Sequence, residues 1–255
     1  MWIDTHCHLD FKQFDSDREK VIQRAIKNKI NRIISIGTDL KSSKKAIELA
    51  EKFAVIYAAV GIHPNDCSQI ENKTFDQIKK LTEHNKVVAI GEIGLDYYRD
   101  FTPAKEQQRI FKIQLNLARL LKLPVIIHNR DAHDDMYNIL IDEKAADIGG
   151  VLHSFTGDSH FLESILAFNF YVSFTGFVTF KNSKSKELIE KVPLEKLLLE
   201  TDSPFLTPVP FRGKRNEPAY IRYIAEKIAQ IKKVSVQELA EITTENAKNL
   251  FNKIK

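Results

Sequence analysis

Six polar side chains, spread along most of the chain, are of types that bind divalent metal ions. They are His6, His8, Glu92, His128, His153 and Asp202. On a strand, side chains two residues apart point to the same face, so His6 and His8 can both reach one ion. Four imidazoles and two carboxylates are enough for two cations. Such a pair, about 3.5–4 Å apart, can activate water and offset developing negative charge. The set points to metal-dependent hydrolysis.

A structural role is the alternative for each of these residues taken singly, because a histidine near the end of a strand is often just a hydrogen-bonded residue. The whole set is harder to explain by packing. Buried carboxylates and imidazoles are costly without partners, and a metal ion supplies that partner. We therefore expect a metal centre.

The elements that must position these residues alternate along the chain. Short apolar runs predict strands that are buried on both faces. These runs are Trp2–Cys7, Arg32–Gly37, Val55–Val60, Val87–Ile93, Pro124–His128, Gly150–His153, Phe170–Phe174 and Lys196–Glu200. Longer amphipathic segments between and after them predict helices. They are Asp15–Asn28, Ser42–Phe53, Thr74–His84, Pro103–Leu121, Ala132–Lys144, Asp158–Phe168, Ser185–Lys191, Pro218–Lys232 and Ser235–Phe251.

Some of these helices carry start signals. Thr74 with Gln77, and Ser235 with Glu238, both fit a capping box. Thr102 followed by Pro103 fits a cap with proline at the first helical position.

Eight strand–helix units in strict alternation favour a parallel sheet, and eight strands can close a barrel. We therefore expect residues 1–255 to form a single (β/α)8 TIM barrel. A doubly wound open sheet is the alternative, but no G-x-G-x-x-G or P-loop pattern follows any of the runs. In a barrel the carboxyl ends of the strands meet at one face, which would bring the six polar residues together.

The composition agrees with a globular enzyme of this size. Of the 255 residues, 43% are hydrophobic and 28% are charged, and the formal net charge is +4. The charge permits a polyanionic substrate without requiring one. Two cysteines form no disulfide framework, and we see neither a signal peptide nor an apolar run of membrane-spanning length. We expect a cytoplasmic protein that is not bound to a membrane.

Several segments resemble the TatD family of metal-dependent deoxyribonucleases, which belongs to the amidohydrolase-like barrels. The likeness covers essentially the whole chain. The matching segments are Ile-Asp-Thr-His-Cys-His-Leu-Asp (3–10), Gly-Ile-His-Pro (61–64), Gly-Glu-Ile-Gly-Leu-Asp-Tyr (91–97), Pro-Val-Ile-Ile-His-Asn-Arg-Asp-Ala-His-Asp (124–134), His-Ser-Phe-Thr-Gly (153–157) and Val-Pro-Leu-Glu-Lys-Leu-Leu-Leu-Glu-Thr-Asp-Ser-Pro (192–204).

The resemblance implies two metal positions that share Glu92. The first would be held by His6, His8, Glu92 and Asp202, and the second by Glu92, His128 and His153. Many amidohydrolases carry a carboxylated lysine at the bridging place. The resemblance also implies phosphodiester hydrolysis in DNA, in the direction 3′ to 5′ on single strands, with Glu92 and Asp202 essential and Asp202 accepting a proton from water.

The identity of the two divalent cations is left open. Imidazole-rich sites suit Zn²⁺ or Mn²⁺ better than Mg²⁺, which prefers oxygen ligands. The family is usually described as magnesium-dependent, so the two considerations disagree.

Two residues near the predicted centre could hold a phosphate. His63 follows the third apolar run; its alternative role is a local hydrogen bond at the Pro64 turn. Arg130 lies two residues beyond His128, and a guanidinium suits bidentate phosphate contact. For Arg130 the alternative is a salt bridge to Asp131 or Asp134.

Two loops after predicted strands could hold DNA farther from the centre. The loop 208–218 is basic through Arg212, Lys214 and Arg215, and a nucleic-acid backbone could lie along it; a merely solvated loop is the alternative. Tyr98, which lies between Tyr97 and Phe101 in the other loop, could stack a base, although packing over the barrel rim would equally explain it.

Two other functions remain open from the residues. The same metal site could hydrolyse another ester or an amide, such as D-aminoacyl-tRNA. A nucleic-acid-binding module that has lost catalysis is the more remote alternative, since lost catalysis should leave gaps in the ligand set.

Overall fold

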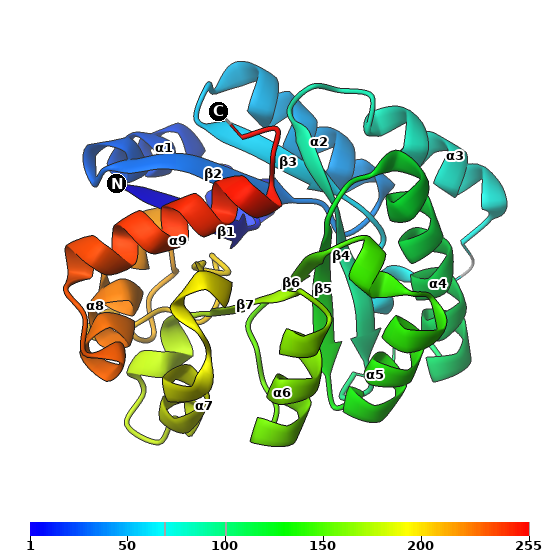
Figure 1. The fold of residues 1–255 in the computed structure, drawn as a ribbon. Helices are drawn as coiled ribbons and strands as arrows, with labels where there is room; N and C mark the ends of the chain where they lie inside the picture. Colours follow the sequence, from blue (N-terminus) through cyan, green and yellow to red (C-terminus); the bar gives the residue numbers. More distant parts are fainter. Residues whose placement is uncertain (69, 100, 255) are drawn as a thin grey trace.

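The computed structural model describes residues 1–68, 70–99 and 101–254, and it contains eight strands surrounded by helices (Figure 1). The strands are β1 (Trp2–Cys7), β2 (Ile30–Ile36), β3 (Ile56–Val60), β4 (Val87–Asp96), β5 (Val125–Arg130), β6 (Gly150–Leu152), β7 (Tyr171–Phe174) and β8 (Leu197–Leu199). The helices are α1 (Arg18–Lys27), α2 (Leu40–Lys52), α3 (Asn72–Leu81), α4 (Ala104–Leu121), α5 (His133–Asp142), α6 (Ser159–Ala167), α7 (Ser185–Lys191), α8 (Ile221–Lys232) and α9 (Val236–Leu250).

The eight strands pair in chain order, from β1 to β8, and each pair is parallel. An isolated parallel bridge between Cys7 and Ser203 joins the chain beyond β8 to the end of β1. The sheet is therefore a nearly closed barrel. The predicted (β/α)8 fold is confirmed, and the open doubly wound sheet is wrong.

Strands β4 and β5 extend beyond their predicted ends at Ile93 and His128. They remain paired through Gly94 with His128 and Asp96 with Arg130, and the pairing is irregular between Ile90 and Ile93. Glu92 was expected near the end of its strand, but it lies inside β4, four residues before the strand ends at Asp96. The extra length places Asp96 at the open end of the barrel.

The presence of the helices was predicted better than the residues at which they begin. Helix α3 begins at Asn72 and is preceded by Glu71, so the predicted capping box at Thr74 is wrong. Helix α4 begins at Ala104, one residue after the expected proline, and no side chain caps it. The cap at Ser235 is confirmed, because its side chain accepts a hydrogen bond from the backbone N–H of Glu238.

The hydrophobic core has two parts. The larger part lies between the strands and the surrounding helices. A second cluster contains residues such as Ile34, Ala89 and Leu198 together with Phe251 and Ile254 from the end of the chain. The C-terminal segment thus packs against side chains of the barrel strands. Lys253 Nζ also donates to the carbonyl of Val87, where β4 begins.

One end of the barrel is therefore covered by α9, whose Asn246 amide donates to the carbonyl of Leu197 at the start of β8. The carboxyl ends of the strands lie at the opposite end, where polar side chains gather. None of the helices in the described residues combines the length and the hydropathy needed to cross a bilayer.

Candidate metal centre

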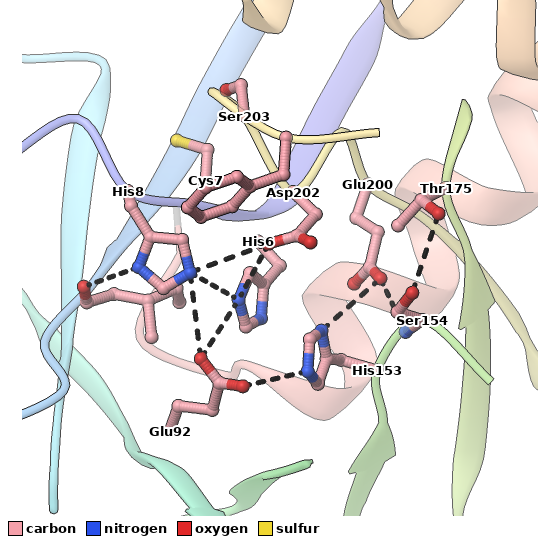
Figure 2. Close-up of polar contacts among 12 residues, drawn as sticks. His6, Cys7, His8, Glu92, His153, Ser154, Thr175, Glu200, Asp202 and Ser203 are labelled. Atoms are coloured by element: carbon pink, nitrogen blue, oxygen red, sulfur yellow. Dashed lines mark hydrogen bonds and ion pairs between the residues drawn. The ribbon is translucent and has the colours of Figure 1, made fainter. Parts of the chain in front are cut away.

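Glu92 contacts a cluster of imidazoles, and Figure 2 shows it facing His6, His8 and His153. Its Oε1 is 2.9 Å from both His128 Nδ1 and His153 Nε2. Its Oε2 is 3.4 Å from His6 Nε2 and 3.6 Å from His8 Nε2. The structure therefore brings side chains from three strands or strand ends onto one buried carboxylate, which is 2% exposed.

Asp202 completes the cluster from the chain that follows β8. Its Oδ1 is 3.5 Å from His8 Nε2 and 3.7 Å from His6 Nε2. Backbone hydrogen bonds fix this approach, from Asp202 N–H to the carbonyl of His6 at 2.9 Å and from His8 N–H to the carbonyl of Ser203 at 2.8 Å. The contacts that join the last strand segment to the first also position the carboxylate.

The imidazoles are oriented by acceptors on their outer sides. His8 Nδ1 is 3.3 Å from the carbonyl of Ile36, and His128 Nε2 is 3.3 Å from Asp96 Oδ2. Each of these outer nitrogens must carry the proton, because a carbonyl or a carboxylate can only accept. The inner nitrogen of a neutral ring then presents a lone pair to the centre, as a metal ligand requires.

The inner nitrogens lie so close together that a proton or a cation must lie between the members of each pair. His6 Nε2 is 3.2 Å from His8 Nε2, and His128 Nδ1 is 3.2 Å from His153 Nε2. Two facing lone pairs repel unless a proton or a cation lies between them. His6 Nδ1 is also buried without a hydrogen-bond partner among the described residues. The donor set thus fits divalent cations.

Three overlapping groups of side chains have ligand atoms close enough to share an ion. The groups are His6, His153 and Asp202; His6, His8 and Glu92; and His63, Glu92 and His128. All six residues expected from the sequence occur in these groups, together with His63, which the sequence suggested only as a phosphate contact.

A backbone hydrogen bond argues against His63 as a ligand. The N–H of Asn65 donates to His63 Nδ1 at 3.0 Å, so Nδ1 uses its lone pair there. Nε2 must then carry the proton, and it lies 3.4 Å from Glu92 Oε1. A protonated nitrogen donates a hydrogen bond and cannot bind a metal. His63 therefore has two roles at once: it closes the local turn, as the simpler alternative held, and it presents an N–H donor beside the centre.

The electrostatics of the centre keep its carboxylates ionised. Burial acts to raise the pKa of Glu92, but its interactions with His153, His63 and His6 outweigh burial and hold this pKa well below its usual value. Burial likewise opposes ionisation of Asp202, whose pKa is lowered by its interactions with His8, His6 and His153. Both carboxylates are therefore available as anionic ligands at neutral pH.

Two further carboxylates, which the sequence did not single out, lie behind the rings of His128 and His153. Asp96 Oδ2 faces His128, and burial of Asp96 is outweighed by that contact and by backbone N–H donors, which lower its pKa to about 2. Glu200 Oε1 is 3.6 Å from His153 Nδ1. Glu200 is fully buried, and it accepts hydrogen bonds from Ser154 N–H at 2.6 Å and Ser173 Oγ at 2.7 Å. Figure 2 shows Glu200 on the far side of the His153 ring from Glu92.

The centre opens into a cleft of about 560 Å³. Besides the residues of the centre, its wall includes apolar and basic side chains, which are Phe11, Phe205 and Leu206, and His63, Arg99 and Arg130. A cleft of this size accommodates a small ligand or the end of a polymer.

The predicted substrate contacts divide into two groups. Arg130 lines the cleft, and its guanidinium lies 3.9 Å above the Tyr98 ring; among the described residues it forms no ion pair with Asp131 or Asp134. Tyr98 is 63% exposed, so packing over the rim does not bury it.

Arg212 and Lys214 are not among the described residues that line the cleft. Arg212 stacks over Phe180 at 4.3 Å, and Lys214 Nζ lies 5.8 Å from the Phe211 ring centroid. Arg215 of the same loop forms two hydrogen bonds of 2.8 Å with Asp17, the residue just before α1. This ion pair neutralises part of the positive charge of the loop.

Comparison with known proteins identifies the relatives of this chain. Residues 3–252 match the family described as TatD related DNase. An uncharacterized metal-dependent hydrolase of Bacillus subtilis, YabD, is 49% identical, and the match covers 98% of this chain and 99% of that one. A protein of Escherichia fergusonii named 3′-5′ ssDNA/RNA exonuclease TatD is 38% identical, over 97% of this chain and 98% of that one. The crystal structure of the TatD homologue YJJV of Escherichia coli superposes with a TM-score of 0.92, at 33% identity and with 98% of each chain covered.

Proposed function

This chain belongs to the TatD-related DNase family of metal-dependent hydrolases, and we propose that it cleaves phosphodiester bonds in single-stranded DNA from the 3′ end. Its membership establishes a hydrolase of ester bonds that depends on metal. The proposal adds the substrate, the direction of cleavage and the residues that act. One relative is named as an exonuclease of single-stranded DNA and RNA, which supports the choice of substrate.

The observation that carries the proposal is the pairing of the imidazole cluster with hydrogen-bond donors in the same cleft. Four imidazoles converge on Glu92, and the outer acceptors of His8 and His128 leave the inner lone pairs of these two rings for a cation, whereas His63 presents an N–H donor and Arg130 a guanidinium. Lone pairs bind cations, and N–H donors bind the oxygens of an anion. A phosphodiester beside two cations uses both kinds of group.

The distances from the imidazoles to the two oxygens of Glu92 support the assignment of ligands. We assign His6, His8, Glu92 and Asp202 to one divalent cation and Glu92, His128 and His153 to a second, with Glu92 shared. Mg²⁺, Mn²⁺ and Zn²⁺ are the candidates. When bound, the cations would lower the pKa of a water molecule and offset charge on the phosphoryl oxygens.

The protein's own groups then have distinct tasks. His63 and Arg130 hold the non-bridging oxygens of the phosphodiester and fix its orientation. Asp202 accepts a proton from the attacking water on its carboxylate. Water attacks phosphorus, the bond from phosphorus to the 3′ oxygen breaks, and that oxygen leaves with a proton. The products are a 5′-mononucleotide and a strand shortened by one residue.

Labelled oligonucleotides test the proposal directly. With added Mg²⁺, Mn²⁺ or Zn²⁺, a 5′-labelled single strand should give a descending ladder, and a 3′-labelled strand should release labelled mononucleotide from the start. A chelator should stop both, and so should Asp202→Ala. Duplex DNA, RNA and D-aminoacyl-tRNA complete the substrate panel. Cleavage of D-aminoacyl-tRNA alone would overturn the proposal.

A further inference from the structure

Phe205 is an exposed phenyl group held on a firmly fixed backbone beside the metal centre. It is 45% exposed. Its N–H donates to the carbonyl of Asp202 at 2.9 Å, and its carbonyl accepts from the amide of the buried Asn216 at 2.6 Å. Because the backbone here is fixed, chain flexibility does not explain the exposure of this large apolar side chain. Its exposure beside the centre is consistent with a binding surface.

The backbone on both sides of Phe205 is strained. Asp202 has φ of 53° and Leu206 has φ of 50°, values that residues with a side chain seldom adopt. Leu206 also packs against Gly176, where a Cβ would lie 1.9 Å from the Leu206 carbonyl oxygen. Strain of this kind persists where the surrounding structure enforces it, and it is concentrated at functional sites.

Phe11 extends the apolar surface toward the centre. Its ring stacks on His8 with centroids 4.6 Å apart, and it meets Phe205 edge to face at 5.9 Å. Together Phe11 and Phe205 form an aromatic wall that begins on one of the imidazoles of the centre. Both residues line the cleft.

Outside the metal centre, the basic side chains that line the cleft are His63, Arg99 and Arg130. Two acids outside the centre, Asp66 and Asp96, also line it. The charge of Asp96 is already engaged by N–H groups of the loop that follows it and by His128. A ligand that fits this cleft has a flat apolar part and an anionic part. A nucleotide, with its base and its phosphate, has both.

We propose that the aromatic wall of Phe205 and Phe11 is the subsite that stacks the unpaired base of the 3′-terminal nucleotide while the adjoining phosphodiester lies at the metal centre. This inference rests on the proposed function. Because every base has a flat face, such a subsite accepts any sequence. A terminal base that is still paired brings the complementary strand with it into the cleft, so we expect the subsite to favour single-stranded ends.

An abasic end tests the subsite. Two single-stranded oligonucleotides of the same sequence are compared, one with a normal 3′-terminal nucleotide and the other with a tetrahydrofuran abasic residue there. The wild type should cleave the normal end with a kcat/KM higher by on the order of tenfold, the scale of one base stacked on an aromatic ring. Phe205→Ala should lose this preference, with little change on the abasic end, and Phe205→Trp should restore it.

Phe101→Ala is the matched control, because Phe101 is also an exposed phenyl, 63% exposed, and does not belong to the described wall of the cleft. It should keep the wild-type preference. Melting temperatures of the variants should lie close to that of the wild type, since Phe205 and Phe101 are 45% and 63% exposed.

A second readout needs no catalysis. A single strand with 2-aminopurine at its 3′ end is mixed with protein in excess chelator, and fluorescence is recorded. Stacking on the aromatic wall should quench the fluorophore in the wild type and in Phe101→Ala, and Phe205→Ala should not quench it.

The outcomes separate the two proposals. If neither oligonucleotide is cleaved with any metal, the proposed function fails. If both are cleaved at equal rates and Phe205→Ala behaves as the wild type in both assays, the enzyme is a nuclease and the subsite is refuted.

Discussion

Replacing Glu200 by glutamine removes one negative charge behind His153 and little else. Glu200 Oε1 accepts from Ser154 N–H, and its Oε2 accepts from the Ser173 hydroxyl. In Glu200→Gln the amide oxygen can keep the Ser154 N–H, while the amide nitrogen can donate to the Ser173 hydroxyl once that hydroxyl rotates. The number of hydrogen bonds stays the same, so the free energy of unfolding should change by only about 1 kcal/mol.

Metal affinity should change more than stability. Burial acts to lower the pKa of His153, and the charge of Glu92, together with that of Glu200 behind the ring, raises this pKa well above its usual value. A carboxylate behind a metal-binding imidazole makes the ring a better ligand and fixes its orientation. Losing such a partner typically costs about 10–100-fold in metal affinity, which corresponds to roughly 1.4–2.7 kcal/mol.

Competition with a chelator measures this effect. Zn²⁺ and Mn²⁺ are titrated into chelated protein in the presence of a chromophoric chelator, and urea unfolding is followed on the same samples without metal. Ser173→Ala is the control, because it removes a donor to the same carboxylate and leaves the charge behind His153 in place. It should lose stability and keep its metal affinity. Wild-type metal affinity in Glu200→Gln, or an equal loss in Ser173→Ala, would refute a role of Glu200 in positioning His153.

Three other outcomes follow from the structure. Glu92→Ala removes the carboxylate common to five imidazole contacts, so metal-dependent cleavage of single-stranded DNA should nearly vanish; activity within a few-fold of the wild type contradicts the assignment. Arg130→Ala should raise KM and lower the slope of log KM against log salt by about 1, whereas Arg212→Ala should change both less; the reverse order would place the strand along the 208–218 loop. Burial raises the pKa of Asp4 from 3.8 to about 8, so its contribution to stability is complete below about pH 4 and is lost as the pH rises to about 8. Asp4→Asn in chelator should therefore gain stability relative to the wild type between pH 5 and pH 8.5 in urea unfolding, and a constant difference would show that Asp4 is ionised in the folded protein.

The barrel and the six polar residues of the centre could be predicted because their signals are local. A histidine or a carboxylate at the end of an apolar run is visible without knowledge of the partners of that run. The start of α3 could not be placed from Thr74 and Gln77, because a capping pattern inside a longer helical segment has the same letters as one at its start.

The positioning carboxylates could not be predicted because they depend on strand register. Asp96 reaches His128 only because β4 and β5 stay paired beyond the irregularity near Glu92, and nothing in either strand alone announces that length. Glu200, which follows β8, approaches His153 at the end of β6 from across β7. Its carboxylate accepts hydrogen bonds from Ser173 and Ser154. Such contacts join residues that are far apart in the sequence, and no repeating pattern in the sequence links the two positions.

Under the two proposals, the segment 202–206 carries both the proton acceptor, Asp202, and part of the subsite for the strand end, Phe205. Asp202 faces His6 and His8, and three residues later Phe205 lies 6.2 Å from the His8 ring. One backbone hydrogen bond joins Asp202 to Phe205, and Asn216 holds the turn from outside through the carbonyls of Thr201 and Phe205. The distance from the proton acceptor to the aromatic wall is thus set by a fixed backbone and does not depend on which base is bound. An enzyme built in this way can advance along a strand of any sequence, because each new terminal base meets the same wall and brings the next phosphodiester to the same carboxylate.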